Sequence, residues 1–325
     1  KETADMYMFK YICKRIGLML LTFSIIFTVC FVLIKLLPIA TSNVSVGEDR
    51  AKIEALIEAR GYNKPIPEQF VLYIKRMLKG DFGMGINMPE YRYDPVWDVF
   101  TEKLPPTVLI NIYSSLFAVP TGIALGILAA LKKNRWQDHL ISTGVMVFIS
   151  VPSFVYASLL LYIVCFRLGW FPLTMKSGFD YFTKDMFLSM VPAVFAMSFG
   201  SIAGYARFTR AELTEVLTSE FMLLARTKGL TKAQATTRHA LRNAMVPIFP
   251  SIVGEFISVM SGSLIIEKIF SIPGVGNLYL NAINAPDYDF FMMLSGFYLL
   301  LGLAASLVID LSYGVIDPRI RMGAK

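Results

Sequence analysis

The sequence predicts an all-α membrane protein with six transmembrane helices and an extracytoplasmic cap between helices 1 and 2. Of the 325 residues, 55% are hydrophobic and 17% are charged, and the mean hydropathy is +0.56. Six apolar stretches approach or reach the ~20 residues that an α-helix needs to cross ~30 Å of hydrocarbon. We expect the spans near residues 12–37, 107–131, 140–166, 187–206, 246–266 and 290–314.

The distribution of basic residues predicts the orientation of these spans. With the amino terminus in the cytoplasm, the inner segments carry seventeen Lys and Arg, and the two short outer loops carry four. Basic residues are enriched in cytoplasmic loops, so we expect both termini to be cytoplasmic. The first apolar stretch is too long for a signal-peptide core and is interpreted as a retained span. The net charge of +7 follows from this topology and indicates membrane lipid, not nucleic acid, as a partner.

The segment between the first two spans is predicted to fold into a small cap. Residues 50–60 and 68–79 each place apolar side chains on one helical face, and GDFGMG at 80–85 favours turns. We expect the cap to contact an external partner, and a passive spacer is the alternative. The chain is accordingly divided into the amino terminus with the first span, the cap, and the core of the remaining spans, at residues 1–37, 38–106 and 107–325.

The most basic part of the core is a cytoplasmic loop predicted at residues 207–245. It contains seven Lys and Arg and is far longer than a turn between two helices requires. Such a loop suggests that a soluble protein docks on it. An amphipathic helix on the inner leaflet, with basic side chains at anionic headgroups, is an equally favoured alternative on these residues alone.

Two short helices are predicted within this loop. Phe221, Leu224 and Ala225 fall at i, i+3 and i+4, which indicates a helix with one apolar face. Gly229 is suited to end that helix in a left-handed cap, and Thr231 can open the next helix through a capping box. The candidate docking residues are Phe221, Leu224, Ala225, Arg226, Lys228 and Gly229.

Small residues recur at every fourth position in two of the spans. We expect close helix contacts there, because lipid provides no hydrophobic drive for helix association and backbones must approach. The pattern is consistent with sliding helices in a transporter and equally with a static bundle. These residues are Ala118, Gly122, Gly126 and Ala130 in the second span, and Ala196, Gly200 and Gly204 in the fourth.

Glu255 lies near the middle of the fifth predicted span, where an ionised carboxylate is costly and usually faces protein or water. In a continuous helix it shares one polar stripe with Ser251, Ser258 and Gly262. The stripe is a candidate lining of a translocation path. Hydrogen bonding of Glu255 to a neighbouring helix is the alternative, and the sequence favours neither.

The sequence contains few residue arrangements that would indicate catalysis or metal binding. Cys13, Cys30 and Cys165 lie in or beside spans without metal-ligand spacing, and we interpret them as packing residues. His139 and His239 are isolated near inner helix ends. No G-x-x-x-x-G-K-[ST] motif occurs. We therefore expect no catalytic residue, metal site or cofactor site, and hence no enzyme activity on this chain.

A series of segments along nearly the whole chain resembles permease subunits of ATP-binding-cassette importers, in the dipeptide/oligopeptide family and of its B-subunit type. Each segment alone is weak, but their order and spacing make the resemblance specific. They are LPPTVLI (104–110), GILAALKKNRWQD (126–138), SVPSF (150–154), LGWFP (168–172), ARTKGL (225–230), RHALRNAMVP (238–247), EKIFSIPGVG (267–276) and IDPRI (316–320).

The resemblance implies a type I-like permease fold in a bacterial or archaeal cytoplasmic membrane. It also implies a second six-span permease subunit, two cytoplasmic ATPase subunits that hold ATP and magnesium, and an extracytoplasmic substrate-binding protein. The helix near Ala225 would couple to an ATPase. The general importer signature has Glu-Ala-Ala and a later Gly; here Leu223 and Leu224 replace the first two residues while Ala225 and Gly229 remain, so no key acid is assigned.

Peptides are the cargo that this resemblance implies, and nickel chelates or oligosaccharides are alternatives within the same importer type. A secondary transporter is less consistent with the sequence, because we find no convincing half-to-half repeat and Glu255 is the single obvious midplane ion. A membrane scaffold without a conduit is the third class considered.

Overall fold

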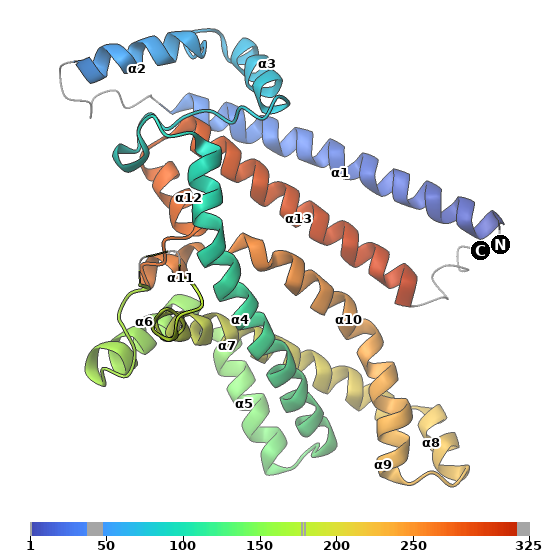
Figure 1. The fold of residues 1–325 in the computed structure, drawn as a ribbon. Helices are drawn as coiled ribbons and strands as arrows, with labels where there is room; N and C mark the ends of the chain where they lie inside the picture. Colours follow the sequence, from blue (N-terminus) through green and yellow to red (C-terminus); the bar gives the residue numbers. More distant parts are fainter. Residues whose placement is uncertain (1, 38–47, 177, 179, 317–325) are drawn as a thin grey trace.

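The computed structural model describes residues 2–37, 48–176, 178 and 180–316, and these are helical in most places (Figure 1). Within these ranges the β-structure is limited to two isolated bridges near Met84 and Gly85. The all-α prediction is therefore confirmed. The first part of the predicted cap, at 38–47, and most of the IDPRI segment lie outside the described residues.

Five helices are long and apolar enough to cross a membrane. They lie in α1 (Glu2–Leu36), α4 (Val96–Leu131), α7 (Lys184–Leu217), the stretch Lys232–Ser261 that includes α10 (Leu241–Ile257), and α13 (Tyr288–Ile316). Five of the six predicted spans thus correspond to membrane-length helices, although the span predicted at 246–266 begins and ends earlier than expected.

The span predicted at 140–166 is not one straight helix. It consists of α5 (Trp136–Ser150) and α6 (Ser153–Leu160), which continues as a π-helical segment to Arg167, and the two parts are bent by 100°. The bend follows from Pro152, because a proline disfavours helical geometry at the preceding residue. Val151 accordingly has extended geometry, with φ −85° and ψ 127°.

The helices form two groups in Figure 1. In one group α1 packs against α13, and α13 packs against α10. In the other, α4 packs along α7, with α5 beside them. Gly122 and Gly126 allow the close approach of α4 to α7: a Cβ at Gly126 would lie 2.6 Å from Thr209 Cβ and 2.7 Å from the Ala206 carbonyl oxygen.

The small-residue prediction is thus confirmed for α4 but not for all of α7. A Cβ at Gly204 would meet nothing within 4 Å, and one at Gly200 would meet only the Tyr156 hydroxyl at 3.5 Å. Ala196, in contrast, is fully buried. The seam on α4 therefore packs against larger α7 residues, and its glycines do not face the glycines of α7.

The predicted cap helices are present as α2 (Glu48–Ala59) and α3 (Ile66–Met77). They lie over one end of α1 and α13 (Figure 1). Tyr73 of α3 joins a buried aromatic cluster with Phe27 and Phe31 of α1 and Tyr288 of α13. The cap is consequently part of the same folded body as the spans.

Two buried carboxylates at the start of α13 attach the rest of the cap. Asp287 accepts hydrogen bonds from the backbone N–H groups of Ile86 and Asn87, at 2.7 and 2.8 Å. Asp289 accepts from the Tyr62 hydroxyl and pairs with Arg60 at 3.4 Å. The segment therefore reaches α13 through directional polar contacts as well as through apolar packing.

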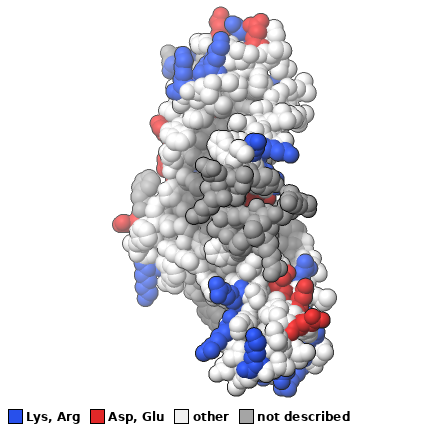
Figure 2. Space-filling view, turned by 90° about the vertical axis from the view of Figure 1, so that its right-hand side faces the viewer, with Lys and Arg blue, Asp and Glu red and all other residues white. Residues whose placement is uncertain are grey.

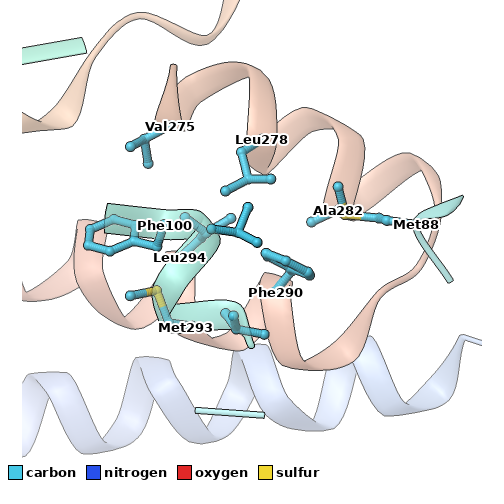
Figure 3. Close-up of a cluster of buried hydrophobic side chains, with 10 residues drawn as sticks. Met88, Phe100, Val275, Leu278, Ala282, Phe290, Met293 and Leu294 are labelled. Carbon is cyan, nitrogen blue, oxygen red and sulfur yellow. The ribbon is translucent and has the colours of Figure 1, made fainter. Parts of the chain in front are cut away.

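Two short helices follow α10, namely α11 (Leu264–Ile269) and α12 (Val275–Asn284). Figure 3 shows the apolar cluster that joins α12 to the end of the cap, the start of α4 and α13. Phe100, Leu278, Phe290 and Leu294 are among its buried members. This cluster fixes the geometry of the end of the molecule that bears the cap.

Candidate functional site

The helices predicted in the long basic loop form a projecting knuckle at the opposite end of the molecule from the cap (Figure 1). We define the knuckle as α8 (Glu220–Thr227) and α9 (Lys232–Ala235) with the turn between them. The loop is shorter than predicted, because α7 continues as helix through Leu217. The apolar residues along this extension, such as Leu213, pack against the knuckle and so maintain the helix.

The turn between the two helices has the geometry that the sequence predicts. Gly229 has φ +90°, and its N–H donates to the Arg226 carbonyl at 3.0 Å. The Leu230 N–H donates to the Ala225 carbonyl at 3.3 Å, which completes a Schellman motif. The left-handed cap at Gly229 is confirmed.

The start of α9 is a complete capping box, as predicted. The Thr231 hydroxyl accepts a hydrogen bond from the Gln234 N–H at 3.3 Å, and the Gln234 side-chain oxygen accepts from the Thr231 N–H at 3.0 Å. Both flanks of the turn are therefore fixed by hydrogen bonds within the knuckle itself.

The apolar face of α8 differs from the prediction. Ala225 is buried, but it is Met222 that joins it against α4, α7 and α9. Phe221 and Leu224 point away from this cluster and are 41% and 56% exposed, as is the neighbouring Leu223 at 65%. Phe221, Leu224 and Ala225 lie on one side of α8, as positions i, i+3 and i+4 of a helix do, but only Ala225 of the three is buried. The knuckle thus presents an uncovered apolar surface.

Exposed basic side chains lie on the knuckle and directly after it. Arg226 and Lys228 of the candidate docking set are exposed, as are Lys232 and Arg238. Figure 2 shows Lys and Arg gathered at the lower end of the molecule, where Figure 1 places α8 and α9, with acidic side chains beside them. Exposed apolar residues together with charged residues are typical of a surface that binds another protein.

Glu255 makes a contact between helices. Its Oε1 accepts a hydrogen bond from the Ser201 hydroxyl of α7 at 2.9 Å, and the side chain is partly exposed. One turn away, the Tyr205 hydroxyl donates to the Ser251 carbonyl at 3.0 Å. The geometry thus contains the contact expected of the packing alternative, and it leaves part of Glu255 accessible.

The predicted polar stripe is wrong in its last member. The α-helix ends at Ile257, a 3-10 turn follows to Ser261, and Gly262 has φ +62°. Ser258 stays in line with the helix, and its hydroxyl donates to the Gly254 carbonyl at 2.9 Å. Gly262 lies instead beside Glu267, and positive φ explains why the helix cannot continue through it.

The sequence reading missed the role of Glu267. Its carboxylate is 1% exposed and accepts hydrogen bonds from the Thr107 hydroxyl at 3.0 Å and from the Gly276 and Asn277 N–H groups at 2.8 and 3.2 Å. A Cβ at Gly274 would lie 2.4 Å from this carboxylate. Burial raises the pKa of Glu267 to about 7, and the hydrogen bonds oppose that rise. These contacts form a cage around the Glu267 carboxylate, and the glycines in EKIFSIPGVG are the sequence signal that could have indicated it.

A second missed pair links α5 to α7. Asp138, which is 2% exposed, accepts bonds from Arg210 at 2.5 and 2.8 Å and from the Asn134 N–H at 2.9 Å. The sequence predicts Arg210 to lie in the basic loop, whereas the continuation of α7 places it in the helix bundle. The charge of Arg210 therefore stabilises the contact between α5 and α7, in addition to being one of the basic residues from which the topology is predicted.

The remaining candidates show no site chemistry. Cys165 is buried, Cys30 is half-buried and Cys13 is exposed, and none forms a disulfide. The described residues contain no group of three or more His, Cys, Asp or Glu that could hold a metal ion. His139 and His239 are exposed on separate elements.

The membrane-length helices, with the bent pair, define a multi-pass membrane protein. Residues 122–322 match the family model "Binding-protein-dependent transport system inner membrane component", and residues 8–111 match the model of the N-terminal part of such components. The chain belongs to this family of importer membrane components. The resemblance that the sequence motifs indicated is thereby confirmed.

Three relatives match over nearly their whole length. The chain is 34% identical over 316 residues to "Dipeptide transport system permease protein DppB" of Lactococcus lactis subsp. cremoris, covering 97% of this chain and 100% of that protein. It is 32% identical to "Oligopeptide transport system permease protein OppB" of Haemophilus influenzae, with 97% and 100% covered. It is also 32% identical to "Glutathione transport system permease protein GsiC" of Escherichia coli (strain K12), with 97% and 99% covered.

Two solved structures share the fold. An amino acid ABC transporter matches with a TM-score of 0.50 and 20% identity, covering 67% of this chain and 94% of that one. The MetNI methionine ABC transporter in inward-facing form matches with a TM-score of 0.50 and 14% identity, covering 66% and 97%. The fold of an ABC permease is thus established independently of sequence motifs.

Proposed function

We propose that this chain is the permease subunit of an ATP-driven importer that depends on a substrate-binding protein. With a second six-span permease subunit it would form the translocation path for dipeptides or oligopeptides. The cargo is supported by the relatives, whose names refer to dipeptide, oligopeptide and glutathione transport. All three are peptides, so the cargo class that these names support is a peptide.

The observation that carries the proposal is the uncovered apolar face of α8. Phe221, Leu223 and Leu224 stand on a knuckle whose turn is rigidly capped and whose base is packed on α4 and α7. A stable apolar surface on a projecting helix fits the cleft of a soluble partner. We assign that partner as one of two cytoplasmic ATPase subunits, which would hold the ATP and magnesium and perform the hydrolysis. This chain would itself be no enzyme and bind no cofactor.

This assignment orients the molecule. The knuckle and both termini would lie in the cytoplasm, and the cap of α2 and α3 would lie on the outer side, where the substrate-binding protein delivers cargo.

Ser251, Glu255 and Ser258 are the proposed path residues, since Glu255 is partly exposed although hydrogen-bonded to Ser201. Cysteines introduced at positions 251 and 258 should react with a water-soluble thiol reagent. If neither cysteine reacts, these residues do not line the path.

The docking role of α8 is tested by Leu224→Asp. Leu224 is 56% exposed, so the substitution leaves the chain folded but places a charge in the apolar contact. We expect the loss of ATPase co-purification and at least a tenfold fall in ATP-dependent peptide uptake by proteoliposomes. The matched control is Ala233→Asp on α9, an exposed position outside the α8 face, which should behave as wild type. Normal uptake by the Leu224→Asp protein would overturn the assignment.

A further inference from the structure

A cavity of about 560 Å³ lies beside the knuckle, between the α4–α5 turn, the end of α7, α8 and α9. Its lining contains four basic residues, Lys133, Arg135, Arg226 and Lys232, and one acidic residue, Glu220. The first two come from the α4–α5 turn, and the other two come from the knuckle. The cavity is therefore positively charged and is shared by two separate parts of the chain.

Within the described part of the chain, the basic side chains of this cavity and one threonine hydroxyl lack partners, whereas the Thr218 and Ser219 hydroxyls donate to backbone carbonyls. Among the described residues, none of the four basic side chains forms an ion pair with an Asp or Glu. The Thr214 hydroxyl oxygen, which also belongs to the lining residues, is buried and has no hydrogen-bond partner within the described part of the chain. The cavity therefore offers a ligand four basic side chains that have no carboxylate partner among the described residues.

The cavity also lies at the end of the membrane-length helix α4. Leu131, which lines it, is the last residue of the α4 span and is 42% exposed. Trp136 and Leu140 at the start of α5 are 69% and 65% exposed. Tryptophan is enriched where spans meet the headgroup region, and a row of exposed apolar residues beside it matches acyl chains. With this end of α4 in the headgroup region, the basic side chains would lie at the depth of lipid phosphates.

We propose that this cavity binds the phosphate-bearing headgroup of an anionic phospholipid. Basic pockets at the cytoplasmic ends of membrane helices suit such headgroups. A lipid fits better than a soluble anion, because Leu131, Leu217 and Leu223 add apolar lining to the same cavity. The inference rests on the cytoplasmic orientation proposed above, and it concerns a ligand that the coupling function does not include. Leu223 and Arg226 belong to both the lining and the docking region, and the variants tested below leave both unchanged.

The bound headgroup would tie the α4–α5 turn to the knuckle. Lys133 and Arg135 would bind it from the α4–α5 turn, and Arg226 and Lys232 would bind it from the knuckle. Without an anion these like charges repel one another across the cavity. The lipid would therefore hold α8 in the position that it needs for docking, and ATP-dependent transport would increase with the anionic lipid content of the membrane.

The test uses the whole importer complex in nanodiscs containing a photoreactive phosphatidylglycerol. The double variant Lys133→Gln with Arg135→Gln removes two cavity charges, and we expect phosphatidylglycerol binding to weaken roughly thirtyfold. The control is Lys132→Gln with Arg238→Gln, which removes the same charge from the same end of the molecule but outside the cavity lining. The control should keep the crosslink and its affinity.

Three results would overturn the proposal. Equal loss in both double variants would mean nonspecific attraction to the surface. Displacement of the probe by soluble glycerol phosphate at equal concentration would mean a site for a free anion. A disulfide between Arg135→Cys and an ATPase segment, with no lipid crosslink, would mean that a protein fills the cavity. Co-purification of the ATPases in each preparation reports the proposed function separately, so the two failures are distinguishable.

Discussion

At the scale of single residues, buried carboxylates organise the parts of this molecule that no hydrophobic pattern reveals. Glu267 of α11 binds the first N–H groups of α12, where the helix dipole favours negative charge, and it also binds Thr107 of α4. The surrounding glycines leave room for this carboxylate and for little else. One side chain thereby connects three elements that are far apart in the sequence.

Two substitutions of Glu267 should distinguish how much the shape and the charge of its side chain each contribute to stability. Glu267→Ala leaves the Gly276 and Asn277 N–H groups and the Thr107 hydroxyl unsatisfied, so we expect a loss of about 3 kcal/mol in unfolding free energy. Glu267→Gln keeps the volume and one acceptor, and it should cost less than half as much. Thermal unfolding of the detergent-solubilised chain measures both. Equal loss in the two variants would show that the charge itself is required.

The raised pKa of Glu267 adds a pH dependence of defined sign. Because its pKa is about 7 in the folded protein and 4.5 ordinarily, the folded state holds a proton that the unfolded state has lost between these values. Stability should therefore fall as pH rises from about 4.5 to about 7 and then level off. The Glu267→Gln variant should lack this component when both proteins are melted across the same pH series.

At the scale of helices, the contact of α4 with α7 is set by Gly122 and Gly126. A methyl group at Gly126 would meet the Ala206 carbonyl, a backbone atom that cannot rotate away. Gly126→Ala should therefore force the helices apart and cost about 1–3 kcal/mol. Gly204→Ala in α7 is the control, since its methyl group meets nothing within 4 Å. Thermal unfolding compares the two, and an equally stable Gly126→Ala protein would contradict the tight contact.

How far the helices could be predicted depends on the range of the interactions involved. The lengths of the apolar stretches predicted where the spans lie, and the local capping signals at Gly229 and Thr231 predicted the knuckle turn correctly. The 100° bend at Pro152 was missed because apolar composition alone does not distinguish one span from two short helices. The stripe through Gly262 failed because the cage around Glu267 forms only after distant segments meet.

At the scale of the whole molecule, the cap and the pair α1 and α13 form one unit. Asp289, which is 2% exposed, holds Arg60, Tyr62 and the Met84 N–H of the cap. This arrangement could not be predicted from sequence, since Tyr62 and Asp289 are 227 residues apart. It means that a protein docking on the cap acts directly on a membrane-spanning helix.

Removal of this attachment should release the cap without unfolding the spans. Asp289→Ala removes the acceptor of the Tyr62 hydroxyl and the Met84 N–H and leaves Arg60 only its 3.6 Å pair with Asp81, so we expect a local cost of about 1–3 kcal/mol. We expect faster proteolysis between residues 60 and 90 and weaker stimulation of transport by the binding protein. The control is Asp185→Ala, which removes an exposed pair with Lys176 and should have little effect. Unchanged protection in Asp289→Ala would show that apolar packing alone retains the cap.

The doubly capped turn of the knuckle has a thermodynamic consequence. Since its Schellman motif and capping box close within the segment 225–234, the docking surface needs no ordering when a partner arrives. Association should then lose little conformational entropy, and its heat-capacity change should reflect only the burial of Phe221, Leu223 and Leu224. Calorimetry of the complex would consequently show the signature of rigid-body docking, with no component from coupled folding.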